Sequence, residues 1–299
     1  MQWAARTRLA LQAGMSSLNP MQSVRGTILR EVHKLVGSRA DTPGFARPPG
    51  DDGILGADAV AWKVHGDFAT MMIGGVSALL LQMLHPAALA GVWDHSNFRR
   101  DMPGRLRRTA QFMAGTTFGA TPYAHQLIDH VRGIHDRVTG TLADGTPYAA
   151  NDPATLAWVH VTGAWSFVEA YRRYRDPLLS SVAHDRYYAE TAIIARALGA
   201  GEVPETRVAV AAYLRTARRS LAADDRTREI ARVILASPPK GAAAPVGRLM
   251  LQAGIDLMPG WASAMHGLGV PPLRRPLIRA GALGLGSVLR WALNAPRAA

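Results

Sequence analysis

The chain has 299 residues, of which 48% are hydrophobic and 19% are charged. This length is sufficient for one large domain with a substantial core, and the composition is globular, without the charge excess typical of disorder. Cysteine is absent. Disulfides, metal–thiolate sites and cysteine nucleophiles are therefore excluded, and any metal must be bound by His, Asp, Glu or Tyr.

The net charge of +12 is concentrated at both ends of the chain. Residues 237–299 contain seven positive side chains and one acidic side chain, which leaves +6, and residues 1–30 contain four arginines and no acid. These arginines are interspersed with Leu, Trp, Met and Ala, which favours peripheral contact with an anionic membrane surface; a solvated basic face is the alternative. No zinc-finger spacing, helix-turn-helix signal or aromatic-rich basic strand indicates a nucleic-acid partner. No continuous apolar segment follows Met1–Arg8, so we expect no cleavable secretory signal and a cytoplasmic location.

Helical periodicity predominates along the chain, which predicts an all-α fold, a single large helical domain without a significant sheet. A basic arm with a Pro- and Gly-rich loop is expected at 1–57, the main domain at 58–236, and a basic helical tail at 237–299 that packs on the domain or on a membrane surface. Helices are predicted at 58–92, 102–118, 122–140, 152–174, 177–199, 204–222 and 224–236. Asp144–Gly145 is interpreted as a connection between helices, because no strand-like runs flank it.

Residues 68–93 carry no formal charge, and a run of this length raises the possibility of a transmembrane helix. The His85–Pro86 step lies within it, and proline removes a backbone donor and disfavours helix at the residue before it. We therefore expect a buried central helix that is broken or kinked near His85. Gly74–Gly75 would allow another helix, or a flat cofactor, to approach closely.

The stretch "DHVRGIHDRVTG", residues 129–140, carries two histidines in an amphipathic pattern. Val131, His135 and Val138 recur at helical spacing, so His135 shares the core-facing side. His130 is five residues away, a rotation of about 500°, which leaves the two imidazoles roughly 140° apart. The pair therefore cannot chelate one metal. His135 is either a core histidine with a hydrogen-bond partner or a ligand.

Motifs of several common catalytic and metal sites are absent: the chain has no Glu-x-x-His, His-Glu-x-x-His, P-loop, Gly-x-Gly-x-x-Gly or Gly-x-Ser-x-Gly. A helical chain with one core-facing histidine can still bind haem, for which one axial imidazole is sufficient. Arg105 and Thr109 lie one turn apart at the edge of the core, with Phe112 on the same stripe, which suits contact with a carboxylate or a bound oxygen species. The alternative is a solvated arginine cluster, which we expect for Arg107.

Four segments, in this order, resemble the oxygenase family that includes MpaB of mycophenolic acid biosynthesis and the latex clearing proteins, or rubber oxygenases. They are "LHPAALAGVWDHSNFRRDMPGRLRRT", "FGAT", "VRGIHDRVTG" and "YAANDPATLAWVHVTGAWSFVEAYRRY". The resemblance covers residues 58–235 and implies a globin-like helical core that binds haem b through one histidine. Arg105 and Thr109 match the family's Arg-x-x-x-Thr pair, and His135 matches the iron ligand.

The resemblance implies an oxygenase that activates dioxygen for attack on a hydrophobic, isoprenoid-like or lipid-like substrate. The candidate residues are His135, Arg105, Thr109, Val131 and Phe112 for haem binding, and Arg105, Arg108, Thr109, His85 and His160 for catalysis or for the distal and substrate side. The rubber oxygenases have a lysine where this chain has Arg108, and arginine does not readily ligate iron, so a lysine-capped resting state is not expected. The alternatives are a haem-dependent dehydrogenase or monooxygenase, and a non-catalytic helical peripheral membrane protein in which His135 only packs.

Overall fold

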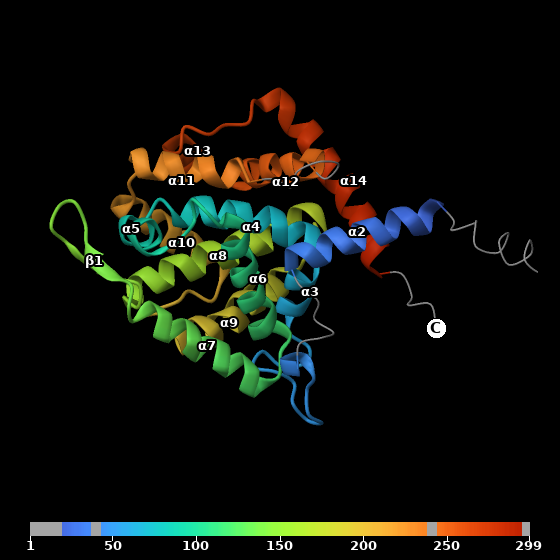
Figure 1. Ribbon diagram of the computed structural model, residues 1–299, viewed down its shortest axis with the longest axis horizontal. Helices are drawn as coiled ribbons and strands as arrows, with labels where there is room; N and C mark the ends of the chain where they lie inside the picture. The colour runs from blue at the N-terminus through green and yellow to red at the C-terminus, as the bar shows by residue number, and fades with distance from the viewer. Residues whose placement is uncertain (1–19, 37–42, 238–243, 295–299) are drawn as a thin grey trace, which may run out of the picture.

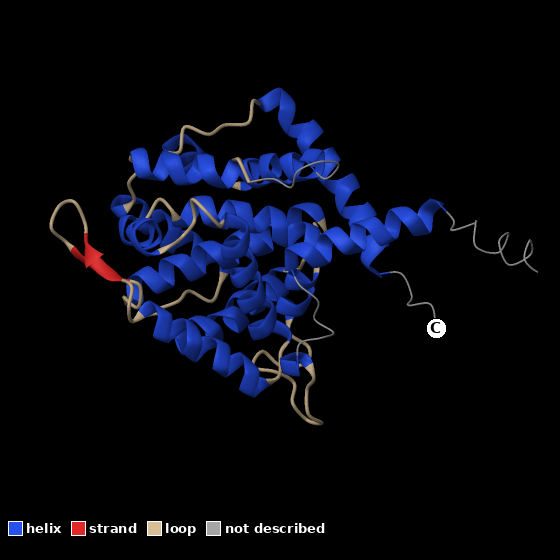
Figure 2. Cartoon of the chain, in the orientation of Figure 1, coloured by secondary structure: helices blue, strands red, loops and turns tan. Residues whose placement is uncertain are grey.

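The computed structural model describes residues 20–36, 43–237 and 244–294. These residues form a predominantly helical protein with one short β-hairpin, as Figure 2 shows, which confirms the predicted all-α class without a significant sheet. Parts of the predicted basic ends, including residues 1–19, Lys240 and Arg297, lie outside the described residues.

The first half of the described chain forms six helices, three of which lie in or near the segment predicted as one helix over 58–92. The helices are α2 (Pro20–Val36), α3 (Val60–Gly66), α4 (Phe68–Gln82), α5 (Pro86–His95), α6 (Met102–Phe118) and α7 (Thr121–His135). The helix predicted over 58–92 is interrupted at Asp67, whose carboxylate accepts a hydrogen bond from the Thr70 backbone N–H at 3.0 Å and so caps α4. It is interrupted again before Pro86, where His85 has an extended backbone (φ −87°, ψ 121°), which confirms the predicted break.

The second half contains the longest helix and the C-terminal layer. Its helices are α8 (Pro153–Tyr174), α9 (Ser181–Leu198), α10 (Arg207–Ala217), α11 (Asp225–Leu235), α12 (Ala244–Leu257), α13 (Gly260–Met265) and α14 (Arg275–Asn294), with 3-10 turns at Pro43–Phe45, Arg218–Ser220 and Pro272–Arg274. The α8 helix begins as its sequence predicts: the Asp152 carboxylate accepts from the Thr155 backbone N–H at 2.8 Å, and Pro153 occupies the first turn.

The interpretation of Asp144–Gly145 was wrong. The helix predicted over 122–140 ends at His135, and the chain then forms one antiparallel hairpin, β1 (Thr139–Thr141) with β2 (Pro147–Ala149). Gly145 takes the left-handed conformation of the turn with φ +87°, and Asp144 accepts a hydrogen bond from the Thr146 backbone N–H. The strands have three residues each, too few to produce a visible alternation in the sequence.

The α4 and α8 helices pack together at the centre of the molecule, with α12 on another side of α4 (Figure 1). A Cβ atom on Gly74 would lie 2.9 Å from the Phe167 ring and from the Ser166 carbonyl oxygen, so glycine permits the close approach of α8. A Cβ atom on Gly254 of α12 would lie 2.6 Å from Val76 of α4. The predicted buried central helix is thus confirmed, and at Gly74 the closely approaching element is a helix.

The described part of the basic tail packs on the rest of the protein. Met250 and Ala253 of α12 belong to one buried apolar cluster with Ile73 of α4 and Ile278 of α14. Among the described residues, no single helix combines the length and apolar composition of a membrane span; α3 and α4 reach them only as a pair bent by 89°. The division of the chain into three parts stays a prediction.

Candidate functional site

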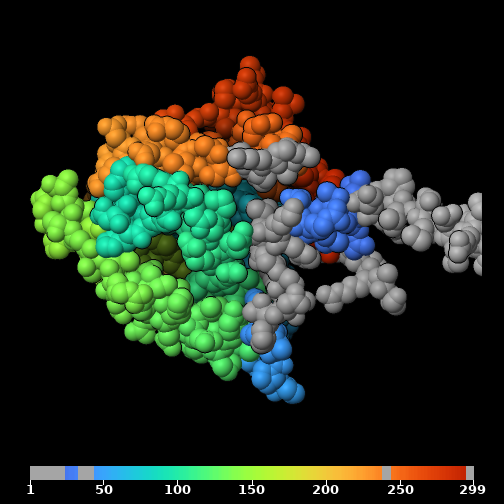
Figure 3. Space-filling model, in the orientation of Figure 1, coloured from blue at the N-terminus to red at the C-terminus, as the bar shows by residue number. Residues whose placement is uncertain are grey.

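The consecutive helices α6 and α7 contain most of the predicted site residues. They meet near their connection, where a Cβ atom on Gly115 would lie 2.2 Å from the Leu127 side chain. Arg105 and His135 lie roughly 15 Å and 12 Å from this contact along their own helices, at the 1.5 Å rise of an α-helix. Figure 3 shows a hollow between the surface of α5–α6 and that of α7. The two predicted key residues are therefore on the two helices that border one hollow.

His135 is the last residue of α7 and is half-buried, whereas His130 is exposed, which confirms the orientation predicted from the helical spacing. The Nδ1 atom of His135 is buried and has no hydrogen-bond partner in the described part of the chain. Burial lowers the pKa of the imidazole, and the side chain of Asn151 and the charge of Asp136 oppose this effect. The imidazole is therefore held in its neutral form near neutral pH, which is the form that can ligate a metal.

Arg105 points from α6 into the protein and donates a hydrogen bond from Nη1 to the Ser96 hydroxyl at 2.9 Å. Burial, together with the charge of Arg108, lowers the pKa of Arg105 to about 10. Within the described ranges no carboxylate forms an ion pair with this guanidinium, although buried charges are normally paired. Arg105 is thus a half-buried cation suited to an anionic group that the described residues do not provide.

Thr109 lies one turn after Arg105 as predicted, but its side chain is exposed and its hydroxyl donates to the Arg105 carbonyl oxygen at 3.3 Å. The predicted contact of this hydroxyl with a carboxylate or oxygen species stays a prediction. Phe112 and Val131 are half-buried, on α6 and α7 respectively. Arg108 is largely exposed and lies 3.7 Å from Asp101, and Arg107 is exposed as expected.

Residues at the end of α5 contact both α6 and the segment that follows α7. The Nε2 atom of His95 is 3.0 Å from the Thr139 carbonyl oxygen, four residues beyond His135. The next residue, Ser96, accepts the hydrogen bond from Arg105. His95 thus contacts the segment after His135, and the adjacent Ser96 contacts the Arg105 guanidinium. The structure therefore brings Arg105 and the C-terminal end of α7 into one region.

Apolar side chains on the central helices remain partly accessible although their helices lie inside the molecule. Val159, near the N-terminal end of α8, is 37% exposed, and Leu79 of α4 and Phe167 of α8 are half-buried. The Gln82 amide at the end of α4 donates to the Val159 carbonyl oxygen of α8 at 3.0 Å. Leu79 and Phe167 pack against two different buried clusters, so Val159 is the most accessible of the three side chains.

His85 is at the N-terminus of α5 and stacks on Trp158 of α8, with ring centroids 6.1 Å apart. Its Nδ1 atom is buried and has no hydrogen-bond partner among the described residues. Burial lowers its pKa, while the charge of Asp152 opposes the shift. His85 and Asp152 border a cavity of about 520 Å³ with Tyr148 of the hairpin. Asn151, the neighbour of Asp152, contacts the region of His135, so the connection before α8 lies between the two histidines.

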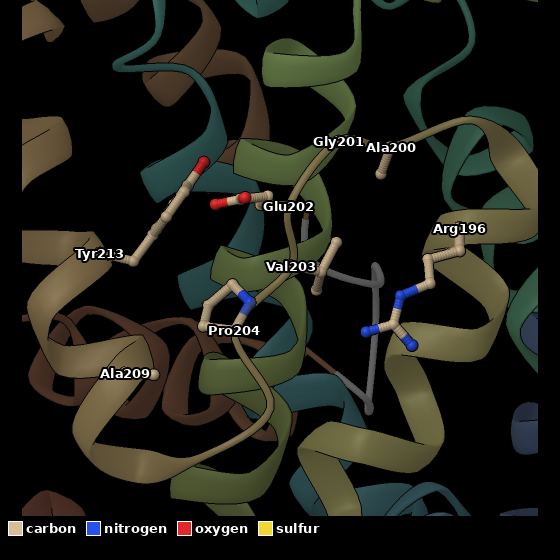
Figure 4. A pocket seen from close by; sticks show the side chains of 8 residues that line it. All are labelled: Arg196, Ala200, Gly201, Glu202, Val203, Pro204, Ala209 and Tyr213. Atoms are coloured by element: carbon tan, nitrogen blue, oxygen red, sulfur yellow. The ribbon is translucent and has the colours of Figure 1, made fainter.

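His160 is placed on α8 beside Arg196 of α9. Burial and the positive charge of Arg196 lower the pKa of His160 to about 4. Arg196 lines a second cavity of about 700 Å³, and Figure 4 shows it across the Ala200–Pro204 connection from Tyr213. In the described ranges, no hydrogen bond, ion pair or ring contact joins His160 to α6 or α7. Its predicted place near the distal pocket stays a prediction.

Sequence reasoning overlooked two residues that contact the candidates. Ser96 follows His95 in "DHS", and Asn151 precedes the Asp152–Pro153 helix start. Both positions suit an ordinary turn or cap, and a helical periodicity cannot assign a partner to a residue outside a helix. The weak signal that could have identified Asn151 is an uncharged hydrogen-bonding side chain immediately before the predicted helix start at 152, whereas Ser96 lies four residues beyond the predicted helix end at 92 and gave no such signal.

The fold and the site define a helical protein with a hollow between α5–α6 and α7, in which α7 carries a half-buried imidazole and α6 a guanidinium that no described carboxylate pairs. The model of the catalytic domain of the family described as "ER-bound oxygenase mpaB/B'/Rubber oxygenase" matches residues 62–291, from α3 into α14. The chain belongs to this oxygenase family. No curated protein and no solved structure gives a match.

The residues around the hollow fit a haem better than a metal ion bound by side chains alone. The described residues contain no group of three or more His, Asp or Glu side chains suited to holding a metal ion. A haem needs one axial imidazole, which His135 offers, and cations for its propionates, of which Arg105 is one. The half-buried imidazole of His135 and the Arg105 guanidinium, which pairs with no described carboxylate, both agree with this donor set.

Proposed function

We propose that the protein is a haem b-dependent oxygenase with a globin-like core, in which His135 is the proximal iron ligand. Membership of the oxygenase family supports the reaction class. The observation that carries the cofactor is the combination of a neutral imidazole, His135, and a half-buried guanidinium without a carboxylate, Arg105, on the two helices that border one hollow.

Each residue of the site has a distinct task in this proposal. Haem held by one imidazole supplies the binding and activation of dioxygen. His135 holds the group in place, and Arg105, fixed by Ser96, binds a propionate with its guanidinium. Phe112 and Val131 exclude water from the faces of the group. Thr109 adds a hydroxyl that can turn from the Arg105 carbonyl oxygen toward the hollow.

The distal and substrate side is assigned to Arg108, His85 and His160. Arg108 stands where the rubber oxygenases have a lysine, and its exposed, protonated side chain is suited to attracting an anionic or polar group and not to ligating iron. The low pKa of His160, and the lowered pKa of His85, keep both imidazoles neutral near pH 7, so either can accept a proton or a hydrogen bond.

The substrate we propose is a hydrophobic small molecule or polymer with an alkene, such as an isoprenoid or a lipid-like chain. Membership of a family that includes rubber oxygenases supports an apolar substrate, and Val159 of α8, which is 37% exposed, is an apolar side chain that such a molecule can contact.

Two experiments separate this proposal from its alternatives. The purified protein is expected to show a Soret band and to consume dioxygen when an isoprenoid is added, with oxygen atoms from ¹⁸O₂ appearing in the product. A haem-dependent dehydrogenase would oxidise its substrate without incorporating ¹⁸O. A purified protein without a Soret band would support the non-catalytic alternative and would contradict the haem proposal.

We also propose that the protein contacts an anionic membrane at its basic C-terminal end. Leu273 and Leu277 are 90% and 74% exposed, next to the exposed Arg274. The net charge overstates the positive charge of this surface, because Arg279 forms an ion pair with the buried Asp256 at 2.7 Å. Binding to vesicles that contain phosphatidylserine is expected to fall at least tenfold in a Leu273→Ser, Leu277→Ser double variant. Equal binding by both proteins would contradict the proposal.

A further inference from the structure

Asn151 lies between the hairpin and α8, and its side-chain nitrogen is fixed by two acceptors. The Nδ2 atom donates to the Arg132 carbonyl oxygen at 3.2 Å and to the Asp136 carboxylate at 2.6 Å. Both partners accept hydrogen bonds only, so the amide cannot be flipped without the loss of both bonds. The orientation of the amide is therefore determined by its surroundings.

The oxygen of the same amide has no partner. Its Oδ1 atom is buried and forms no hydrogen bond within the described residues, and the same holds for Nδ1 of His135. The two side chains are neighbours, since the Nδ2 atom of Asn151 bonds to Arg132 and Asp136, which lie three residues before and one residue after His135. An unpaired buried acceptor beside an unpaired buried ring nitrogen costs free energy unless the two groups bond to each other.

We propose that Asn151 is a positioning residue for His135: its Oδ1 atom accepts the Nδ1–H of the imidazole and leaves Nε2 free to ligate iron. This inference rests on the proposed haem function. An amide oxygen whose nitrogen is already bonded can only accept, so it selects the Nδ1-protonated tautomer and fixes the rotation of the ring. Partners of this kind orient ligating histidines and increase their basicity.

The backbone keeps Asn151 in place independently of the imidazole. The N–H of Ala150 donates to the Val138 carbonyl oxygen at 2.8 Å, and the N–H of Asp152 donates to the Ala149 carbonyl oxygen at 3.1 Å. Asp152 then caps α8. The residue is thus held between the end of the hairpin and the start of the longest helix, a rigid mount for a group that orients a ligand.

The test uses the purified haem protein and two sets of substitutions. Asn151→Leu removes the acceptor. The exchange Asn151→Asp with Asp136→Asn keeps the net charge and the side-chain pair, but places the carboxylate beside the imidazole. Gln126→Leu, on the exposed face of α7, the helix that carries His135, is the matched control. The readouts are the iron–histidine stretching frequency of the ferrous protein by resonance Raman spectroscopy, the reduction potential and the haem affinity.

The exchange variant is expected to raise the stretching frequency and lower the reduction potential, because a carboxylate is the stronger acceptor. Asn151→Leu is expected to shift both quantities in the opposite direction and to weaken haem binding about 10- to 100-fold. Gln126→Leu is expected to match the wild type. An unchanged frequency in both haem-bearing Asn151 variants would overturn the inference alone, whereas a wild-type protein without haem would overturn the proposed function and this inference with it.

Discussion

The buried His65 and the half-buried His135 differ in how their ring nitrogens are partnered. His65 on α3 uses both ring nitrogens: Nδ1 is 2.8 Å from the Thr117 hydroxyl and Nε2 is 2.9 Å from the Tyr187 hydroxyl. His135 on α7 has a buried Nδ1 atom without a partner in the described chain. The first arrangement is that of a structural histidine, and the second leaves hydrogen-bonding capacity for a role beyond packing.

The same contrast extends to the charged residues of the two regions. Glu190 of α9 is buried, and its carboxylate accepts from the Val60 and Ala61 backbone N–H groups at 3.1 and 2.9 Å and from Arg186 at 2.7 Å. Within the described ranges, the guanidinium of Arg105 on α6 has only the neutral Ser96 hydroxyl as its partner. The buried groups on the α3–α9 side are thus paired within the fold, while the α6–α7 side carries groups without such partners among the described residues, as the proposed haem site requires.

The largest effect is expected from His135→Ala. This variant should lose the Soret band of the purified protein completely, because it removes the axial ligand, while its helical content by circular dichroism is unchanged. His130→Ala, on the exposed face of the same helix, is the control and should retain the band. A haem-bearing His135→Ala variant would contradict the ligand assignment.

The reverse pattern is expected for His65→Leu. This change leaves the hydroxyls of Thr117 and Tyr187 without the imidazole and should lower the free energy of unfolding by roughly 2–4 kcal/mol. Chemical denaturation measures this loss. The folded variant should still bind haem with the wild-type stoichiometry, and loss of haem from a well-folded His65→Leu protein would show that the two regions are not separate.

A smaller effect is expected from Arg105→Met, which keeps the apolar stem and removes the charge. Haem affinity should fall about tenfold, or about 1.4 kcal/mol, because a propionate loses its charged partner. Apo-myoglobin competition for haem can measure the difference. Arg107→Met on the exposed face is the control, and an equal loss of affinity in both variants would argue against a specific role for Arg105.

The smallest effect concerns pH and His184 of α9, which is 3% exposed. Burial and the charges of Arg172 and Arg207 lower its pKa from 6.5 to about 4. Between pH 6.5 and pH 4, His184 therefore binds a proton in the unfolded chain but not in the folded protein. The contribution of His184 to the free energy of unfolding is fully present above pH 6.5 and is lost as the pH decreases toward 4. The loss at pH 6 is about 1 kcal/mol for this group. His184→Gln should lose less stability than the wild type between pH 8 and pH 6, and an identical loss would contradict the assignment.

The helical class, the break at His85 and the inward orientation of His135 could be predicted because periodicity and proline act locally. The hairpin around Asp144–Gly145 was missed, since strands of three residues give no periodic signal and are held by pairing with each other. Ser96 and Asn151 were also missed. Their roles depend on contacts with other elements, and a single sequence does not state which residues meet across helices.

The central claim is that His135 provides the axial imidazole of a haem in the hollow between α6 and α7. The most direct test is the absorption spectrum of a purified His135→Gly variant mixed with haem, before and after imidazole is added. We predict no specific Soret band without imidazole and recovery of the wild-type spectrum with it, because free imidazole can occupy the space of the missing side chain. A variant that shows the wild-type spectrum without imidazole would contradict the claim.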